Sequence, residues 1–421
     1  MEAVRADSES WAREVDLAAR RLRGVVASTP LERCKRLSLR YGAEIHLKRE
    51  DLQEVRSFKI RGAYNLISAL SPAEAARGVV CASAGNHAQG VAYACSALGI
   101  RGTVFMPLAT PLQKIERVRH FGGDLVEVRL SGYSYDEAAE AADRHCVETG
   151  AVCVHPFDDP ATIAGQGTIA AELVGQLGAA PDIVVSAVGG GGLAGGIAAY
   201  MAEREPATRV IGAEPAGSPS MHESLRQARP VRLDRIDTFV DGAAVKAPGA
   251  LTFELCRRHL ERVVLVPEGA VCTALIELYQ NEGIIGEPAG ALSVAALDLV
   301  ADELVGRTAV CVLSGGNNDI LRYPEIMERS LVHQGRKHYF IVEFAQKPGQ
   351  LRKFVDQALG PTDDIVRFEY MKKTNKERGA ALVGIELRDR ADLEPLLRRM
   401  EVLQLHCRRL SSDELLYEYL I

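Results

Sequence analysis

At 421 residues the chain exceeds one ordinary hydrophobic core, so we expect two or three domains. Hydrophobic residues make up 47% and charged residues 25%, as in soluble globular proteins, which excludes a disordered or fibrous chain. The formal net charge of −6 leaves no basic surface of the size that nucleic acid requires, so we expect no nucleic-acid partner.

The N-terminal segment 1–10 is polar and lacks the apolar centre of a secretory signal. No uninterrupted apolar run approaches the roughly 18 residues of a membrane span. The nine cysteines are an odd number without a C-x-x-C pair, and we expect them to be reduced, with neither disulfides nor a metal site. Cys81, Cys153 and Cys311 lie in apolar strand-like runs and are expected to be buried. These features predict a cytoplasmic protein without a membrane partner.

A recurring unit occupies residues 40–320, where a short apolar run meets a turn of small residues and an Ala/Leu-rich helical stretch follows. The four clear cases are 78–82 before SAGNHAQG, 182–188 before GGGGLAGG, 210–213 before EPAGSPS, and 308–313 before SGGNND. Apolar strands without polar alternation, separated by helices, predict a parallel sheet covered on both faces, which is a doubly wound α/β fold. Ligands bind beyond the carboxyl ends of such strands, so we expect all four loops to converge on one site.

The pattern changes after Tyr323-Pro324. The predicted elements are then a strand at 338–344, a helix at 351–359, strands at 365–371 and 380–387, a helix at 393–400, and a strand-like run at 403–410. The order β-α-β-β-α-β is the ferredoxin-like motif. With a linker near 330–337, we predict a catalytic domain at 1–330, with a smaller subdomain at roughly 50–155, and a second domain at 337–411.

Lys59, in RSFKIRGAYN, is the first candidate for chemistry. Most lysines simply extend from an exposed helical face. Here Arg56 and Arg61 would help keep the amine neutral by cation–cation repulsion, if they lie close. A neutral amine is what Schiff-base chemistry requires.

Two strand-end loops carry further candidates. In SAGNHAQG the small residues free backbone N–H groups at a helix start, an arrangement that binds carboxylates or phosphates. Asn86 can hydrogen-bond a planar heteroatom, and Ser83 can carry a proton. In SGGNND the hydroxyl of Ser314 would point into the same crevice. Taken alone, each loop is more typical of an ordinary turn than of a binding site.

The run GGGGL at 189–193 lowers the stability of the fold, since each glycine costs roughly 0.5–1 kcal/mol of folding free energy relative to alanine. An anion-binding cradle at a helix N-terminus would justify that cost. The rival interpretation is a nicotinamide-dinucleotide fold, with G-x-G-x-x-G from Gly190 to Gly195 and Glu214 as its acidic partner. That rival leaves Lys59 and SGGNND unexplained.

Together and in this order, RSFKIRGAYN, SAGNHAQG, GGGGL and SGGNND resemble the threonine dehydratases of the tryptophan-synthase-β-like (fold type II) group of pyridoxal-phosphate enzymes, over residues 15–325. HPFDDP at 155–160, FVDGAAV at 239–245 and GEPAGA at 286–291 strengthen the resemblance. The stretch HYFIVEFAQKPGQLRKFV, with ALVGIEL, is similar to the ACT-like regulatory domain of the biosynthetic threonine dehydratases, present here as a single unit.

The resemblance implies pyridoxal 5'-phosphate as the cofactor and a role for each matching residue. Lys59, after Phe58, would hold the cofactor as a Schiff base, and Asn86 would bond its phenolic oxygen. The phosphate would lie on the amides of Gly189, Gly190, Gly191, Gly192 and Leu193, the pyridine nitrogen on Ser314, and the substrate carboxylate on the loop of Ser83, Asn86 and His87. Lys59 and Ser83 would be the catalytic pair.

The resemblance also bears on two acidic residues. Glu287 is similar to a family glutamate that approaches the cofactor, but it equally fits a plain helix cap. Some relatives, such as serine racemase, bind a divalent cation through a glutamate and a following aspartate. Here Glu214 is followed by Ser218 and Ser220, with no acidic residue before Glu223, so we expect no metal site.

The function implied is deamination of L-threonine to 2-oxobutanoate and ammonia by β-elimination of water, the first step of isoleucine biosynthesis, with L-serine as a second substrate. A neutral hydroxyl such as that of Ser314 would not hold the ring nitrogen protonated, so prompt loss of a β leaving group is favoured. The alternatives are a serine/threonine racemase using Lys59 and Ser83 on opposite faces, a serine-preferring dehydratase, and a regulatory amino-acid-binding protein, which should lack the lysine. The resemblance also implies an isoleucine or valine effector at the C-terminal domain, whose alternative role is oligomerisation, and a homo-oligomer (dimer or tetramer).

Overall fold

The computed structural model describes residues 10–371, 376–411 and 420, and these form two compact units. The first unit contains residues 10–268 and 278–318, and the second contains 269–277 with the described residues from 319 onward. The first nine residues of the polar N-terminal segment lie outside the described part of the chain.

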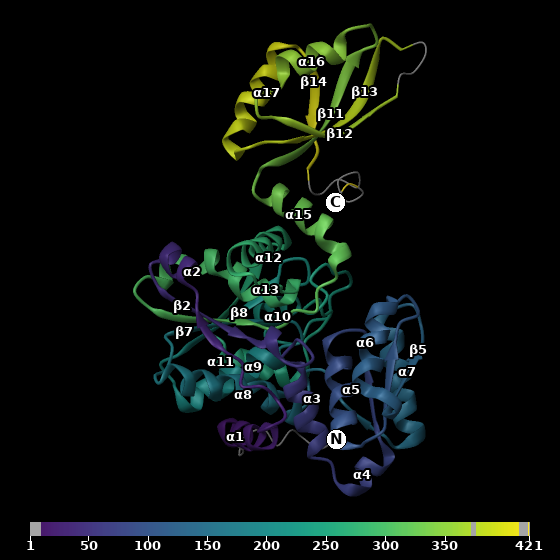
Figure 1. Ribbon diagram of the computed structural model, residues 1–421, viewed down its shortest axis with the longest axis vertical. Coiled ribbons are helices and arrows are strands. Elements are labelled where there is room, and N and C mark those ends of the chain that lie inside the picture. Colours follow the sequence, from purple (N-terminus) through teal and green to yellow (C-terminus); the bar gives the residue numbers. More distant parts are fainter. Residues whose placement is uncertain (1–9, 372–375, 412–419, 421) are drawn as a thin grey trace. The chain divides into compact units, whose positions relative to one another are not determined.

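The first unit contains two sheets (Figure 1). The larger has the order β1-β2-β10-β7-β8-β9, and its neighbours are parallel except for β1 against β2. The smaller has the order β5-β4-β3-β6 and is wholly parallel. The strands are β1 (Leu31–Arg33), β2 (Glu44–Arg49), β3 (Val79–Ala82), β4 (Gly102–Met106), β5 (Val126–Leu130), β6 (Val152–Cys153), β7 (Ile183–Ala187), β8 (Arg209–Pro215), β9 (Arg262–Val266) and β10 (Thr308–Leu313). The predicted α/β class is confirmed, with the strands divided between two sheets.

The helices of this unit connect and cover the strands. They are α1 (Trp11–Leu22), α2 (Lys35–Tyr41), α3 (Lys59–Ser68), α4 (Pro72–Arg77), α5 (Asn86–Leu98), α6 (Leu112–Gly122), α7 (Tyr135–Thr149), α8 (Pro160–Leu177), α9 (Gly192–Arg204), α10 (Ser220–Arg226), α11 (Ala250–His259), α13 (Pro288–Ala295) and α14 (Ala301–Leu304), and α12 (Glu268–Glu282) belongs partly to each unit.

The central strands of the large sheet are buried along their length because helices cover both faces. Every residue of β7 is buried, and so is every residue of β10 except Thr308. Val184 and Val312 from these strands pack with Leu173 of α8 and Ile197 of α9 in one apolar core. Burial on both faces explains why these strands show no alternation of apolar and polar residues.

The small sheet is also covered on both faces, but by different helices. Val79 and Cys81 of β3 pack with Val91 of α5, whereas Val80 packs with Ala142 of α7. Successive side chains of a strand point to opposite faces, so one short apolar strand contributes to two cores. The strands of this sheet lie between residues 79 and 153, within the range 50–155 predicted for a smaller subdomain.

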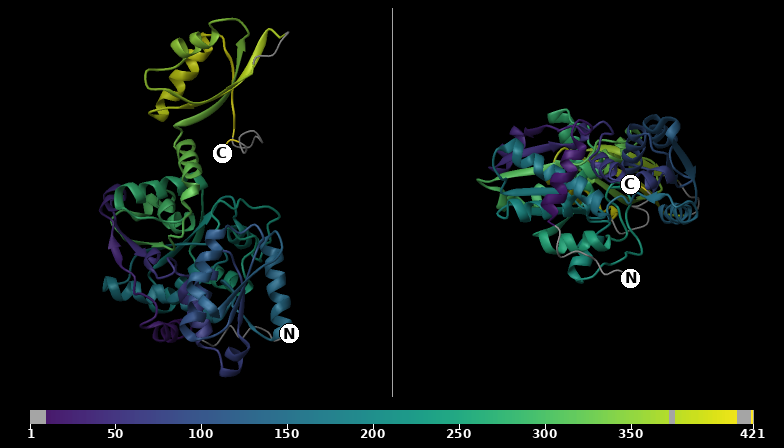
Figure 2. Two further views of the ribbon diagram at one scale, coloured as in Figure 1. Left: turned by 45° about the vertical axis from the view of Figure 1, so that its right-hand side comes forward. Right: turned by 90° about the horizontal axis from the view of Figure 1, so that it is seen from below.

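The second unit is built on an antiparallel sheet of order β12-β13-β11-β14. Its elements are α15 (Tyr323–His333), β11 (Lys337–Ala345), α16 (Gln350–Ala358), β12 (Asp364–Tyr370), β13 (Arg378–Glu386), α17 (Leu393–Val402) and β14 (His406–Arg409). Helices α16 and α17 lie on one face of this sheet (Figure 2), and Phe354 and Leu396 bury their side chains against it. The predicted ferredoxin-like order is confirmed.

All nine cysteines are free thiols. Cys81 and Cys311 are buried as expected, but the expectation for Cys153 is wrong, because β6 is a two-residue edge strand and this side chain is exposed. No helix in the described part of the chain is long and apolar enough to cross a membrane.

Candidate active site

A cavity of about 1200 Å³ opens where the carboxyl ends of β3, β7 and β10 meet. Every residue predicted for the site lines it, namely Phe58, Lys59, Ser83, Asn86, His87, Gly189, Gly190, Gly191, Gly192, Leu193 and Ser314. The prediction that the loop EPAGSPS after β8 also reaches this site is wrong, because none of its residues is among those that line the cavity. That loop turns back into the short helix α10.

Lys59 is the first residue of α3, and the loop after β10 holds it in place. The Phe58 N–H donates to the Ser314 carbonyl oxygen at 3.0 Å, and Lys59 Nζ donates to the Pro156 carbonyl oxygen at 2.9 Å. Burial lowers the pKa of Lys59 to about 8, and the nearby Glu287 carboxylate partly opposes that shift. A substantial fraction of the amine is therefore neutral near physiological pH.

The prediction that Arg61 helps to keep the Lys59 amine neutral is wrong. Its guanidinium is 1% exposed and donates to Glu50 at 2.7 and 2.8 Å and to Glu172 at 2.7 Å. Because the carboxylates of this buried ion-pair network neutralise the Arg61 charge, Arg61 does not lower the pKa of Lys59. Nor is Arg56 a cause: burial is the only influence that lowers this pKa, and Glu287 acts in the opposite direction.

Asn86, at the start of α5, belongs to a chain of side-chain hydrogen bonds at the cavity wall. Its Nδ2 donates to Glu287 Oε1 at 2.5 Å, and its Oδ1 accepts from Asn317 Nδ2 at 2.7 Å. Burial raises the pKa of Glu287 to about 7, and Asp241 adds to the effect. The helix-cap interpretation of Glu287 is wrong, because its side chain makes no capping hydrogen bond to α13 and instead reaches Asn86.

The other polar residues of this loop differ in what they offer the cavity. Ser83 Oγ accepts the Gly85 N–H at 3.2 Å, which leaves its own proton available. His87 is 3% exposed, and burial lowers its pKa to about 3, so its ring is neutral and Nε2–H donates to the Val154 carbonyl oxygen at 2.7 Å. His87 therefore contributes no charge to the cavity.

The glycine run forms the tight turn between β7 and α9. Gly191 precedes the helix with φ of 92°, a left-handed conformation that suits glycine. A Cβ on Gly190 would come within 2.3 Å of the Phe157 ring, and Thr252 Oγ1 donates to the Gly190 carbonyl oxygen at 2.6 Å. The first N–H groups of a helix have no intrahelical acceptor, so this turn presents free amides at the cavity.

Ser314, in the loop after β10, is 2% exposed and donates from Oγ to the Ala289 carbonyl oxygen at 3.2 Å. The hydroxyl can rotate, so that its proton is donated to an acceptor in the cavity instead.

Glu214 argues against the dinucleotide-binding rival. It is fully buried, outside the cavity lining, and accepts the N–H groups of Met221 and His222 at 2.7 and 2.8 Å. Burial raises its pKa to about 8. Among the described residues, no group of three or more His, Cys, Asp or Glu side chains is arranged to hold a metal ion.

Sequence reasoning missed the ion pairs at the mouth of the cavity. Lys114 Nζ lies 2.9 Å from Asp241 Oδ2, and Asp136 Oδ2 accepts from Arg232 at 2.8 Å and from Lys246 at 3.0 Å. The partners are about a hundred or more residues apart in the chain, so no local pattern indicated them. They join the small subdomain to the loop before α11.

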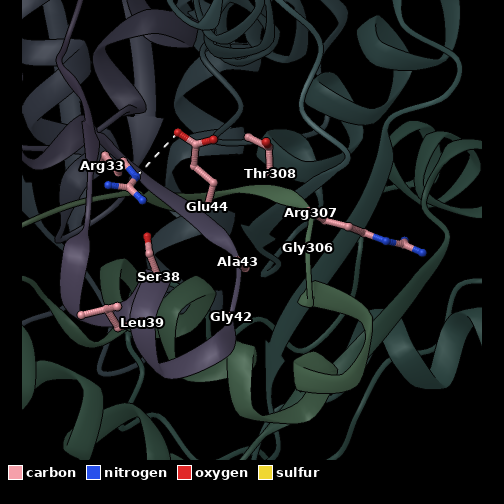
Figure 3. A pocket seen from close by; sticks show the side chains of 9 residues that line it. All are labelled: Arg33, Ser38, Leu39, Gly42, Ala43, Glu44, Gly306, Arg307 and Thr308. Atoms are coloured by element: carbon pink, nitrogen blue, oxygen red, sulfur yellow. Dashed lines mark ion pairs between the residues drawn. The ribbon is translucent and has the colours of Figure 1, made fainter.

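A second, smaller hollow of about 280 Å³ lies at the opposite, amino-terminal ends of β2 and β10 (Figure 3). Arg33 and Glu44 form an ion pair there at 3.6 Å, and the Arg307 side chain points away from them. None of the predicted site residues lines this hollow.

Comparison with known proteins gives concordant matches for both units. The family model "Pyridoxal-phosphate dependent enzyme" matches residues 22–315, and the model "C-terminal regulatory domain of Threonine dehydratase" matches residues 328–420. The chain is 55% identical over 410 residues to the biosynthetic L-threonine dehydratase IlvA of Mycobacterium tuberculosis, covering 97% of this chain and 95% of that protein.

Among solved structures, the processed form of threonine deaminase isoform 2 from Solanum lycopersicum matches with a TM-score of 0.73 and 38% identity, over 77% of this chain and 94% of that one. Maize serine racemase matches with a TM-score of 0.71 and 30% identity, over 76% of this chain and 98% of that one.

Proposed function

Since this chain belongs to the pyridoxal-phosphate-dependent enzymes and, within them, to the family of the biosynthetic threonine dehydratases, we propose that it converts L-threonine into 2-oxobutanoate and ammonia by β-elimination of water. The observation that carries the proposal is the position of Lys59, a partly buried amine of lowered pKa at the point where three strand-end loops meet.

The residues of the cavity fit pyridoxal phosphate. The amine of Lys59 is accessible from the cavity and partly neutral, the turn at Gly189–Leu193 presents free backbone amides for a phosphate, and the volume suffices for cofactor and substrate together. When bound, the cofactor supplies an electron sink for the charge that develops on the substrate Cα.

In this proposal Lys59 holds the cofactor and, once the substrate amine has displaced it, accepts the Cα proton at Nζ. The lowered pKa supports both steps, because only the neutral amine is a nucleophile or a base, and lowering the pKa raises the neutral fraction at a given pH. Release from the cofactor leaves Nζ within reach of the Pro156 carbonyl oxygen, which can orient it.

The surrounding groups position the reactants. The Ser83–His87 loop, at the start of α5, would hold the substrate carboxylate on backbone N–H groups, and Ser83 would supply the hydroxyl on the face opposite Lys59. Asn86, held by Glu287 and Asn317, would bond the phenolic oxygen of the cofactor.

Ser314 would bond the pyridine nitrogen through a neutral hydroxyl. A neutral hydroxyl at this position would not hold that nitrogen protonated, and such an environment would favour prompt loss of a β leaving group. Elimination is therefore favoured over reactions that need a long-lived carbanion.

A serine/threonine racemase is the second candidate. Lys59 and Ser83 both line the cavity, as a two-base reaction requires, and two structural neighbours are serine racemases. The match to a dehydratase regulatory domain favours the dehydratase. A serine-preferring dehydratase would share every feature of the site described above.

The deciding experiment incubates the enzyme, loaded with pyridoxal phosphate, with L-threonine and separately with L-serine, and measures keto acid and D-amino acid in the same samples. The proposal predicts 2-oxobutanoate from threonine as the main product, with pyruvate formed more slowly from serine. D-threonine or D-serine as the main product would support the racemase.

The second unit is proposed to bind isoleucine or valine as an effector, since its sequence matches a regulatory domain. The measurement is 2-oxobutanoate production from threonine with and without each amino acid.

We also propose a homo-oligomer (dimer or tetramer) and, from the nine free thiols, a cytoplasmic location. The domain boundary near 330–337 stays a prediction.

A further inference from the structure

Arg56 has an unusual backbone conformation. Its φ is 57°, in the left-handed region, and only Ala228 and Gln404 share a positive φ among the described non-glycine residues. A side chain in this region costs free energy, because Cβ crowds the following carbonyl oxygen. Such strain persists only where the surrounding structure imposes it, and it is concentrated at functional sites.

Hydrogen bonds to the SGGNND loop impose this conformation. The Arg56 carbonyl oxygen accepts the Gly316 N–H at 2.9 Å, and the Phe58 N–H donates to the Ser314 carbonyl oxygen at 3.0 Å. Between them, Ser57 and Gly315 form an antiparallel bridge. The segment before Lys59 is thus tied to the cavity wall, and glycine at position 56 would satisfy the same pairing without strain.

The side chain of Arg56 is exposed and lines the cavity, and it makes no hydrogen bond or ion pair with any other residue that the structure describes. Of the other basic residues that line the cavity, Lys114, Arg232 and Lys246 are paired with aspartates, and the Arg117 guanidinium lies over the Phe121 ring. Arg235 also lines the cavity and, like Arg56, makes no ion pair with a described residue. Arg56 is therefore a cation facing the cavity that the protein leaves available for a ligand.

The position of the Arg56 guanidinium indicates which ligand it would bind. A Cβ on Gly316 would lie 3.5 Å from Arg56 Nη2, so the guanidinium lies over that glycine. The next residue, Asn317, donates to Asn86 Oδ1 and to the Val55 carbonyl oxygen. Arg56 is thus on the Asn86 side of the cavity, on a different loop from the glycine turn that would take a phosphate.

We propose that Arg56 is a specificity-determining residue that binds the carboxylate of the amino-acid substrate. The inference rests on the proposed function and adds a charged group to the backbone N–H groups of the Ser83–His87 loop, which would hold the same carboxylate. The planar guanidinium matches a carboxylate through two parallel N–H···O bonds, and its charge disfavours amines and amides that lack one.

The experiment compares Arg56→Gly and Arg56→Lys with wild type and with Ala228→Gly, which relieves a similar backbone strain on an exposed residue away from the cavity. Binding of two unreactive probes, 3-hydroxybutanoate and its neutral amide, is measured by titration calorimetry on the cofactor-loaded enzyme. Thermal unfolding is followed for each variant.

In Arg56→Gly we expect affinity for 3-hydroxybutanoate to fall about tenfold, as for loss of one charged hydrogen-bonding group, while affinity for the amide stays unchanged. The KM for threonine should rise by a similar factor, with kcat within about twofold. The unfolding midpoint should equal or exceed that of wild type, because glycine accepts the left-handed conformation. Arg56→Lys should lose less affinity, and Ala228→Gly should bind both probes as wild type does.

Unchanged binding of 3-hydroxybutanoate in Arg56→Gly would overturn the proposal, as would equal losses for both probes. A loss confined to pyridoxal phosphate would assign Arg56 to the cofactor instead and would also overturn it. A further outcome is that the wild-type enzyme fails to make 2-oxobutanoate while Arg56→Gly still binds 3-hydroxybutanoate more weakly than wild type does. In that case the proposed function fails and the carboxylate site stands.

Discussion

The pKa of Lys59 determines how readily the protein can take up its cofactor. With the pKa at about 8, about one amine in ten is neutral at pH 7, against about one in 3000 for a lysine of pKa 10.5, an advantage of about 300-fold. Burial provides this advantage, and the Glu287 carboxylate reduces it. The variant Glu287→Gln removes the opposing charge, so we expect the pKa of Lys59 to fall further.

The assay is the rate of pyridoxal phosphate binding to cofactor-free protein, followed by visible absorbance across pH. In wild type the rate should rise with pH to a midpoint near 8, because only the neutral amine reacts. The midpoint should move to lower pH in Glu287→Gln. It should stay in place in Arg56→Gln, since arginine does not set this pKa.

A wild-type midpoint near that of an ordinary lysine would refute the reasoning. So would a midpoint that moves upward, or not at all, in Glu287→Gln. An upward shift in Arg56→Gln would restore the explanation by cation repulsion.

Three further substitutions test other parts of the structure. Arg61→Met leaves the Glu50 carboxylate unpaired and buried, so we expect a loss of about 3–5 kcal/mol in the free energy of unfolding at pH 7, measured with urea. The unpaired carboxyl should titrate at a raised pKa, so the loss should shrink at pH 5, and an equal loss at both pH values would contradict this account. Ser314→Asp should slow elimination relative to racemisation, and a large rise in elimination rate with normal cofactor binding would count against the assigned role. Asp158→Ala removes a carboxylate that accepts three N–H groups of α11 at 3.0 Å, so thermal unfolding should show a loss of about 1–2 kcal/mol, whereas an unchanged midpoint would show that the cap is dispensable.

The fold was largely predictable because its strands are simple. The run TAVCVL is apolar throughout and ends in a turn of small residues, so both its burial and its direction follow from the sequence. The two-residue strand β6 was harder: Cys153 sits in an apolar run, yet the strand pairs on one side only and the thiol is exposed. Edge and centre strands differ in their neighbours, which a local pattern does not record.

The predicted site residues all line the cavity, but Asn317 of the same loops was not singled out, and the causes of the residues' properties were not predicted. The sequence places Arg61 two residues from Lys59, and proximity along the chain suggested an electrostatic role. In a helix, residues two apart point in different directions, and Arg61 faces Glu50 and Glu172 instead. The burial that lowers the pKa of Lys59 comes from segments distant in sequence, such as the one carrying Pro156.

The most direct test of the account identifies the lysine that carries the cofactor. The enzyme is loaded with pyridoxal phosphate, the covalent bond is reduced with borohydride, and the modified peptide is located by mass spectrometry. The account predicts the pyridoxyl group on Lys59 and its absence at that position in Lys59→Ala. Stoichiometric labelling of another cavity lysine, such as Lys114 or Lys246, or no covalent label at all, would contradict it.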